Sequence, residues 1–461
     1  MSVAEPIVLP LPAKEEPAHR ALLTELFDVA VKSVSADLCV PFCLPDAVPG
    51  RTLILAIGKA GAAMARAAHK HMQGTVDGIV LTRYEHSFPA NQMPPGFTVF
   101  EAGHPLPDEH GIAATRHILE AVRALGPDDQ LLALVSGGAS ALLTMPAAGV
   151  TLADKQEVTR QLLQCGASIS EINCVRTHLS AVKGGRLALA AAPAKVVTLV
   201  LSDIPGDDPA LVGSGPTLPD RTRLADANKI LDLYGIAAPE HVRAALADPA
   251  NETPNASADT FESAQTTVVA RSNNALQAAG QMAVAAGYTP VYLGSDVEGD
   301  SSELGTIHAA LALHHAQKGG RWALLSGGET TVVVRNPNGR GGRNAEYLLS
   351  LALALDGAPG ISALSCDTDG IDGTEDNAGA LVTPTTLARA PARPFADQGA
   401  AHQYQLQLLF GAGRPCRDRP DPHQRQRFPA DPGRSLSRST LSVFGMWDGR
   451  AAAVAADKPP P

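Results

Sequence analysis

Residues 322–351 read WALLSGGETTVVVRNPNGRGGRNAEYLLSL, and this stretch decides the fold that we expect for the second half of the chain. An apolar run leads into SGGE at 326–329, a second apolar run follows, and GRGGRN at 339–344 precedes an amphipathic segment. This order predicts a strand, a glycine loop, a second strand, a second glycine loop and a helix. Glycine lets backbone N–H groups approach an anion closely, and Arg340 and Arg343 add charge suited to carboxylate or phosphate. The alternative interpretation is a tight strand-to-helix connection with two surface arginines.

The SGG motif has an echo at 136–138, where it again follows an apolar run. Two such loops, one in each half of the chain, predict an anion-binding cleft that is lined from both sides. Neither loop fits the GxxxxGK[ST] pattern of a Walker A motif or the GxGxxG pattern of a dinucleotide site. Ser136 and Ser140 have no GxSxG context, so we do not expect acyl-transfer nucleophiles there. Ordinary tight turns are the alternative.

The composition bounds the class of protein. A chain of 461 residues, of which 45% are hydrophobic and 18% charged, predicts two or three globular domains. The net charge of −10 argues against a general nucleic-acid binder. Six cysteines without a CxxC pair favour a reduced, cytoplasmic location over a zinc site or a disulfide framework. We find neither a signal-peptide pattern nor an apolar run of membrane-spanning length, so we expect no membrane and no nucleic acid as partner.

The first half of the chain alternates short apolar runs with helical patterns. This alternation predicts a doubly wound, Rossmann-like parallel α/β sheet, whose functional loops lie at the carboxyl ends of the strands. Strands are expected at 51–57, 78–82, 97–100, 130–135 and 195–201, and helices from 17 onward and at 60–72, 111–125, 152–165 and 169–190. The residues expected at the carboxyl ends of these strands are Lys59, Ser136, Gly137, Gly138 and Asp203.

A polar, turn-rich segment at 247–262 predicts a linker before a second block. That block is expected to contain strands at 266–270, 289–293 and 361–364, helices at 273–286 and 304–317, and an acidic loop at 296–303. The predicted domains are a Rossmann-like domain at 17–250, a smaller α/β domain at 263–390 and an aberrant tail at 391–461.

Acidic residues follow two of the expected strands. Asp367, Asp369 and Asp372 follow the strand at 361–364, and Asp203 and Asp208 follow the strand at 195–201. Carboxylates at strand ends suit Mg²⁺ shared with phosphates, whereas the missing terminal glutamate argues against a calcium loop. Turns rich in aspartate are the alternative. Lys59 also has two interpretations, because it is either an anion ligand or a solvated residue at a helix start.

A series of longer motifs carries a resemblance to a known family. In chain order they are AIGKAGAAM, EAGHPLPD, SGGASALL, ADKQEVTRQLLQCGASISEIN, VRTHLSAVKGGRLA, SDIPGDDPALVGSGPT, SGGETTVVV, GRGGRNAE and CDTDGIDGTEDNAGA. Together they resemble the glycerate 2-kinase family, which carries a DUF4147 domain and a C-terminal MOFRL domain and whose members are often labelled hydroxypyruvate reductase. The resemblance covers roughly residues 17–390. Two departures are Ala139, where the family has a glycine, and Thr177, where it has a lysine.

The resemblance implies phosphorylation of D-glycerate to 2-phosphoglycerate, with ATP and Mg²⁺ as cofactors, in a cleft between the two domains. It implies D-glycerate and a nucleotide as partners, and a homodimer as the candidate assembly. Lys59 and Arg343 match the lysine and arginine assigned there to catalysis. Residues expected to bind phosphate or substrate are Gly58, Ser136, Gly137, Gly138, Ser140, Arg176, Lys183, Ser214, Ser326, Gly327, Gly328, Glu329, Gly342, Asn344 and Glu346, and the expected metal ligands are Asp203, Asp208, Asp367, Asp369 and Asp372.

The family pattern stops near residue 390. Residues 411–434 contain six arginines and five prolines and have no apolar period. Read in another frame, this segment back-translates into a sequence like the family's usual ending, so our hypothesis is a frameshift near 390. A natural Arg/Pro-rich tail is the alternative. We expect residues 391–461 to be disordered or irregular and not to complete the second domain.

Three functions therefore compete. The first is a glycerate 2-kinase, and the second is an NAD(P)H-dependent hydroxypyruvate reductase. The missing GxGxxG pattern and the two SGG motifs favour the kinase. The third is an inactive remnant that still binds nucleotide, because the altered C-terminus removes a family segment.

Overall fold

A computed structural model describes residues 16–254, 257, 259–333, 341–368, 370, 372–373, 377–389 and 440–446. The chain divides into two compact units. The central unit is Val34–Arg271, and the terminal unit combines Met1–Ser33 with Ser272–Pro461. The expected cleft between them stays a prediction. Among the described helices, none combines the length and the apolar character needed to cross a membrane.

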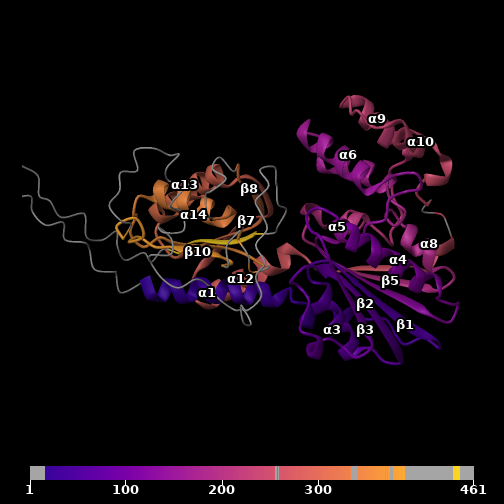
Figure 1. The fold of residues 1–461 in the computed structure, drawn as a ribbon. Coiled ribbons are helices and arrows are strands. Elements are labelled where there is room, and N and C mark those ends of the chain that lie inside the picture. Colours follow the sequence, from indigo (N-terminus) through magenta and orange to yellow (C-terminus); the bar gives the residue numbers. More distant parts are fainter. Residues whose placement is uncertain are drawn as a thin grey trace, which may run out of the picture. The chain divides into compact units, whose positions relative to one another are not determined.

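The central unit contains a six-stranded parallel sheet with the order β3-β2-β1-β4-β5-β6 (Figure 1). Its strands are β1 (Arg51–Ile57), β2 (Thr75–Arg83), β3 (Phe97–Ala102), β4 (Gln130–Val135), β5 (Lys195–Leu201) and β6 (Gln265–Ala270). The chain runs outward from β1 in one direction as far as β3 and then in the other direction from β4. This is the doubly wound order, and its switch point lies between β1 and β4. The predicted fold class is confirmed.

Helices cover both faces of this sheet because its strands are apolar on both sides. One apolar core joins β1, β2, β4 and β5 to α2 (Ala36–Cys39) and α3 (Gly61–His71). A second core, on the other face, includes α4 (Glu109–Arg123), α5 (Ala139–Leu142) and α8 (Arg186–Ala191). The remaining short elements of the unit are α11 (Asp259–Glu262) and the 3-10 turns Pro41–Cys43, Ala90–Gln92, Pro205–Asp207, Val212–Ser214 and Pro249–Asn251.

Four further helices form a layer with its own apolar core, which we call the helical layer. They are α6 (Leu152–Gln164), α7 (Ile169–His178), α9 (Leu224–Leu233) and α10 (Glu240–Ala247), and α6, α9 and α10 are seen apart from the sheet in Figure 1. Capping boxes at Thr151 and Ser168 fix the starts of α6 and α7. The single helix expected at 169–190 was wrong. Helix α7 ends at His178, and α8 begins only after Gly184 and Gly185, whose φ angles of 58° and 84° are not helical.

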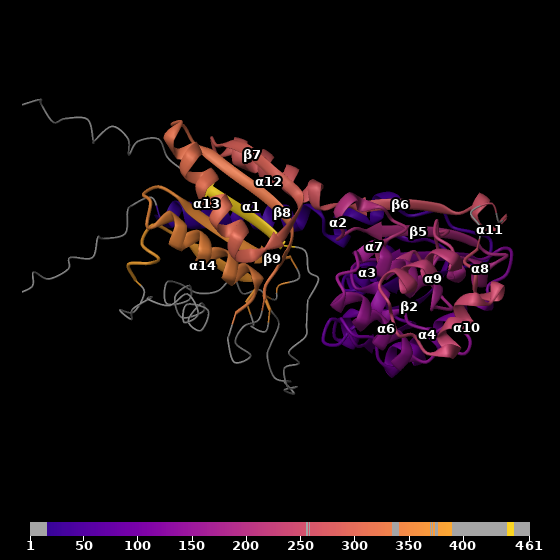
Figure 2. The ribbon, with the colours of Figure 1, turned by 90° about the horizontal axis from the view of Figure 1, so that it is seen from above.

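The terminal unit contains a five-stranded sheet with the order β10-β9-β11-β8-β7 (Figure 2). Strands β7 and β8 are parallel, while β11 is antiparallel to both β8 and β9, and β10 is antiparallel to β9. Helices α1 and α12 pack together on the sheet, and α13 packs with α14. The bounds are α1 (Glu16–Ser33), α12 (Ser272–Ala285), β7 (Thr289–Asp300), α13 (Ser301–Gln317), β8 (Trp322–Thr331), α14 (Arg343–Leu355), β9 (Ser362–Asp367), β10 (Gly379–Val382) and β11 (Thr440–Met446).

Two expected loops of the terminal unit are regular secondary structure instead. The second SGG motif lies inside β8, and the acidic stretch expected to be a loop at 296–303 forms the end of β7 and the start of α13. The two strands stay paired beyond an irregularity, with Val297 opposite Gly328. A Cβ on Gly328 would lie 2.1 Å from the Val297 carbonyl oxygen, and its φ is 143°. Glycine thus permits close strand pairing here, and the sequence echo is not a structural repeat.

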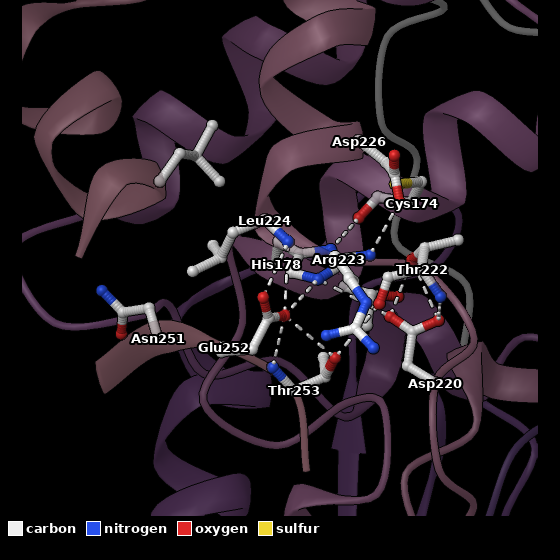
Figure 3. A network of polar contacts seen from close by, with 12 residues as sticks. Cys174, His178, Asp220, Thr222, Arg223, Leu224, Asp226, Asn251, Glu252 and Thr253 are labelled. Carbon is white, nitrogen blue, oxygen red and sulfur yellow. Dashed lines mark hydrogen bonds and ion pairs between the residues drawn. The ribbon is translucent and has the colours of Figure 1, made fainter. Parts of the chain in front are cut away.

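The compact units differ from the predicted domains at four places. Helix α1 belongs with the terminal unit, and β6 closes the sheet of the central unit. The predicted linker is part of the central unit: the Glu252 carboxylate accepts hydrogen bonds from the Leu224 and Thr253 amides at 3.2 and 3.0 Å (Figure 3). The tail was expected not to complete the second domain, but β11 lies between β8 and β9. The remaining tail residues lie outside the described part.

Candidate functional site

The turns that follow β1 and β4 are joined to each other by backbone hydrogen bonds. The Lys59 amide donates to the Gly137 carbonyl at 2.8 Å, and the Ser136 amide donates to the Ile57 carbonyl at 2.9 Å. The Ser136 hydroxyl is buried and accepts a hydrogen bond from the Ala60 amide at 3.1 Å. Ser136 therefore holds the turns together, in line with the expectation that it is not a nucleophile.

Glycines let five predicted site residues lie close together in what we call the strand-end cluster, which consists of Gly58, Lys59, Gly137, Gly138 and Asp203. A Cβ on Gly137 would lie 1.7 Å from Oδ2 of Asp203. A Cβ on Gly138, whose φ is 82°, would lie 3.4 Å from Cγ of Lys59. A side chain at Gly137 would displace the Asp203 carboxylate, and a Cβ at Gly138 would lie 2.9 Å from the His104 ring. The structure thus brings these predicted residues together at the carboxyl end of the sheet.

Charge in the strand-end cluster is set by one lysine and one aspartate. Burial raises the pKa of the Asp203 carboxyl, and the positive charge of Lys59 opposes that rise. Asp203 follows β5, and Lys59 is half-buried after β1. A carboxylate and an ammonium group on neighbouring glycine turns can hold opposite ends of a metal–phosphate group.

A second group of predicted residues lies around Ser140. The Lys183 ammonium donates to the Ser140 carbonyl at 2.6 Å and to its hydroxyl at 2.8 Å. The Ser140 and Ser214 hydroxyls lie 2.9 Å apart. Ser214 has a φ of 61°, which is uncommon for a residue with a side chain. Lys183 is almost fully buried, so this hydrogen-bonded chain fixes a cation behind the first SGG turn.

Sequence reasoning missed Lys155. It lies on α6 and, with Val158 and Leu162, forms the buried side of that helix. Its position three residues before Val158 on an apolar helix face was the available signal. Burial, followed by the charges of Arg176 and Arg186, lowers the pKa of Lys155 to about 7.

Asp208 does not join the strand-end cluster. Its carboxylate accepts a hydrogen bond from the Ala210 amide at 3.0 Å and pairs with the exposed Arg221 at 3.5 Å. These contacts are those of a turn, which was the alternative interpretation of this aspartate.

In the terminal unit, Arg343 is buried and held by two carboxylates. Its guanidinium donates to Glu329 at 3.2 Å and to Asp367 at 2.9 Å. It also donates to the Thr330 carbonyl at 3.3 Å. The contacts tie the start of α14 to β8 and β9. The predicted catalytic arginine is thus engaged in ion pairs, and its role in phosphate binding stays a prediction.

Asp372 caps helix α14 in this structure. Its carboxylate accepts from the backbone amides of Asn344 at 3.1 Å and Ala345 at 3.0 Å. A Cβ on Gly342 would lie 2.1 Å from the Asp372 carboxylate, so glycine is required beside the cap. The Asn344 side chain also accepts from the Ser365 hydroxyl at 2.6 Å. Burial raises the pKa of Asp372, against hydrogen bonds from Asn344 and Ala345 that lower it.

The other predicted residues of the terminal unit lie on β8 and α14. Among the described residues there is no group of three or more acidic, histidine or cysteine side chains placed to hold a metal ion. Ser326 and Glu346 are buried, and Glu329 pairs with Arg343. Arg340 and Asp369 lie outside the described residues. The residues placed on β8 are Ser326, Gly327, Gly328 and Glu329, and those at the start of α14 are Gly342, Asn344 and Glu346.

Comparison with protein families gives two matches. Residues 22–247 match the family described as "Domain of unknown function (DUF4147)", and residues 322–406 match the MOFRL family. The first match ends at the start of the predicted linker at 247–262, and the second begins at β8.

Individual relatives cover most of the chain. A protein of Agrobacterium vitis with the provisional name hydroxypyruvate reductase is 49% identical over 376 residues, which are 80% of this chain and 84% of the relative. The D-glycerate 2-kinase of Thermotoga maritima is 38% identical over 80% of this chain and 87% of its own length. The crystal structure of a Thermotoga maritima glycerate kinase superposes with a TM-score of 0.77 at 33% identity, covering 93% of this chain and 100% of that chain.

Proposed function

Because this chain belongs to the glycerate 2-kinase family, we propose that it phosphorylates D-glycerate at the 2-hydroxyl, using ATP and Mg²⁺. The 2-hydroxyl oxygen forms the new P–O bond, the bond from the γ-phosphorus to the β–γ bridging oxygen breaks, and the hydroxyl proton is released. The products are 2-phosphoglycerate and ADP. The observation that carries the proposal is the strand-end cluster, in which Lys59 stands on two joined glycine turns beside Asp203.

Phosphoryl transfer depends mainly on positioning and on charge stabilisation. In our proposal, Lys59 contacts the transferring phosphoryl group, and the turns at Gly58 and Gly137 let the backbone approach it. Arg343 supplies a second positive charge once a phosphate competes with Glu329 or Asp367 for its guanidinium. Each of these contacts offsets negative charge on the transferring group.

The residues fit Mg²⁺ that is held mostly by nucleotide phosphates. Mg²⁺ usually takes only one or two protein carboxylates in such sites. Asp203 fits this role, because its carboxyl lies against Gly137 and its charged form is favoured by Lys59. The metal would neutralise phosphate charge. Asp208 and Asp372 fit less well, since backbone amides already occupy their carboxylates.

The test uses the full chain with ATP, Mg²⁺ and D-glycerate, and identifies the product by ³¹P NMR. Lys59→Met should lower kcat by about 100-fold or more. Lys70→Met on the exposed side of α3 is the matched control and should retain wild-type rates. ADP formation that does not depend on Lys59 would refute its role, and 3-phosphoglycerate as product would refute the assigned hydroxyl.

A second candidate follows from the name of the Agrobacterium relatives, which is hydroxypyruvate reductase. The turn after β1 reads GKAG at 58–61 and lacks the glycine pattern that lets a dinucleotide pyrophosphate approach a helix start. NADH or NADPH oxidation with hydroxypyruvate, without ADP formation in the kinase assay, would reverse the choice. Nucleotide binding without turnover in either assay would support the inactive remnant.

A further inference from the structure

Lys155 is a buried cation without a hydrogen-bond acceptor. It is 6% exposed, and within the described part of the chain its ammonium group makes no hydrogen bond. A buried charge without a partner is strongly unfavourable, so native proteins almost always supply one. The helix that carries it is well anchored, because α6 begins in a capping box at Thr151. Local disorder therefore does not account for the missing partner.

The positively charged side chains near Lys155 make its ammonium form less favourable unless an anion is bound. Burial lowers the pKa of both Lys155 and Lys183. The positive charges of Arg176 and Arg186 lower the pKa of Lys155 further, and those of Arg176 and Lys155 do the same for Lys183. Three cations from α6, α7 and the turn before α8 thus lie within one another's electric fields. Lys183 uses two of its three N–H groups on Ser140, which belongs to the turn after β4. The cluster is therefore linked directly to the first SGG turn.

A neighbouring network shows how this unit supplies hydrogen-bond partners to other buried nitrogen-bearing side chains. The buried His178 lies 3.3 Å from the Glu252 carboxylate and 2.9 Å from the Cys174 carbonyl, as Figure 3 shows. Arg186 donates to the carbonyls of Thr177 and Lys183 at 3.2 and 3.1 Å. Burial lowers the pKa of Arg186, and the negative charges of Asp220 and Glu252 oppose that fall. Acceptors surround these side chains. Lys155 differs, because its neighbours are cations.

We propose that Lys155, Arg176 and Lys183 form a buried binding site for a small oxyanion, a carboxylate or a phosphate, within the central unit. The hydroxyls of Ser140 and Ser214 complete its polar wall, since they lie 2.9 Å apart on the Lys183 side. The site rests on the proposed function for the identity of its occupant, which is either the carboxylate of D-glycerate or a nucleotide phosphate. Its existence does not depend on turnover.

The test is isothermal titration of the full chain with inorganic phosphate, D-glycerate and ADP in separate arms. Lys155→Met should weaken phosphate binding by about 10- to 100-fold, the range expected for removal of one charged hydrogen-bond donor. The matched control is Lys229→Met on α9, an exposed lysine whose pair with Asp226 spans 3.3 Å, and it should bind like wild type. Arg176→Gln is the second variant, and circular dichroism melting confirms that each variant is folded.

The arms identify the occupant. If the variants bind phosphate and D-glycerate more weakly than wild type but bind ADP normally, the site holds the substrate carboxylate. If they bind phosphate and ADP more weakly but bind D-glycerate normally, the site holds a nucleotide phosphate. The inference is overturned if Lys155→Met and Arg176→Gln bind all three anions as tightly as wild type, if Lys229→Met weakens binding equally, or if wild type binds none of them. Phosphate binding through Lys155 in a chain that does not phosphorylate D-glycerate would refute the proposed function and leave the site standing.

Discussion

Replacing Lys155 by methionine should stabilise the protein. The side chain sits on the apolar side of α6 with Val158 and Leu162, and its ammonium group has no acceptor among the described residues. Methionine has a similar length and no charge, so it can occupy the same space without a buried cation. We therefore expect Lys155→Met to raise the free energy of unfolding of the ligand-free chain.

The magnitude follows from proton linkage. The pKa of Lys155 falls from 10.5 to about 7 on folding, mainly through burial. The unfolded chain therefore binds more protons between these two values, and the free energy of unfolding rises with pH across that window. Below pH 7 the whole difference destabilises the folded state by about 5 kcal/mol, at pH 7 by about 4 kcal/mol, and at pH 9 by about 2 kcal/mol. Above pH 10.5 it vanishes.

Urea unfolding at pH 7 and pH 9 measures this difference. Circular dichroism is the suitable probe, because the sequence has no tryptophan within residues 34–271. Lys155→Met should exceed wild type by several kcal/mol at pH 7 and by clearly less at pH 9. Phosphate should stabilise wild type and not the variant. The reasoning would be refuted if the variant were less stable than wild type, or if the difference in the free energy of unfolding did not change with pH. In either case the effect of Lys155 on stability would come from its packing and not from its buried charge.

Further predictions concern other parts of the two units. Gly137→Ala should abolish kinase activity, because its Cβ would lie 1.7 Å from the Asp203 carboxylate, whereas Gly126→Ala, with its nearest atom at 3.8 Å, should retain activity in the same coupled assay. Asp372→Ala should lower the free energy of unfolding of the terminal unit by about 1–3 kcal/mol, read by Trp322 fluorescence, because α14 loses its cap; an unchanged midpoint would contradict this. Asp154 has a pKa lowered to about 2 by Thr151 and then His241, so its stabilising effect is present above pH 3.8 and should be lost as pH falls to about 2, while Asp154→Asn should show a flatter acid-unfolding profile. A chain that ends at residue 434 should lose cooperative unfolding of the terminal unit, and one that ends at 448 should keep it, because only the second retains β11.

The fold of the central unit could largely be predicted because its strands are continuously apolar. Strands β1, β4 and β5 were predicted to within one residue of their observed bounds. Parallel strands that are buried on both faces appear in the sequence as continuous apolar runs, so their ends are easy to locate. The break at Gly184 was missed because Leu, Ala and Val continue a helical pattern on both sides of it. The backbone φ angles at glycine residues interrupt the helix here, and the spacing of apolar residues does not predict those angles.

The candidate site was predicted unevenly for a similar reason. The turns at Gly58 and Gly137 follow strands, so topology alone places Lys59 and Asp203 together. The second SGG motif looked the same in sequence, but the length of the neighbouring strand β7 keeps it in the sheet. Ion pairs such as Arg343 with Asp367 join residues from different elements, and no local pattern records them. Lys155 was missed because the pattern of this helix alone does not indicate that a charged residue lies on its buried side.

The position of β11 has a consequence for synthesis on the ribosome. Residues 34–271 are contiguous, so the central unit can fold as soon as they have left the exit tunnel. The terminal unit cannot, because its sheet has β8 and β9 on either side of a strand that begins only at Thr440. Helix α1 is made first and yet packs with α12, and its His19 reaches Ser362, 343 positions away. The sheet of the terminal unit can therefore close only after β11 has left the exit tunnel, and until then the edges of β8 and β9 that pair with β11 are unpaired.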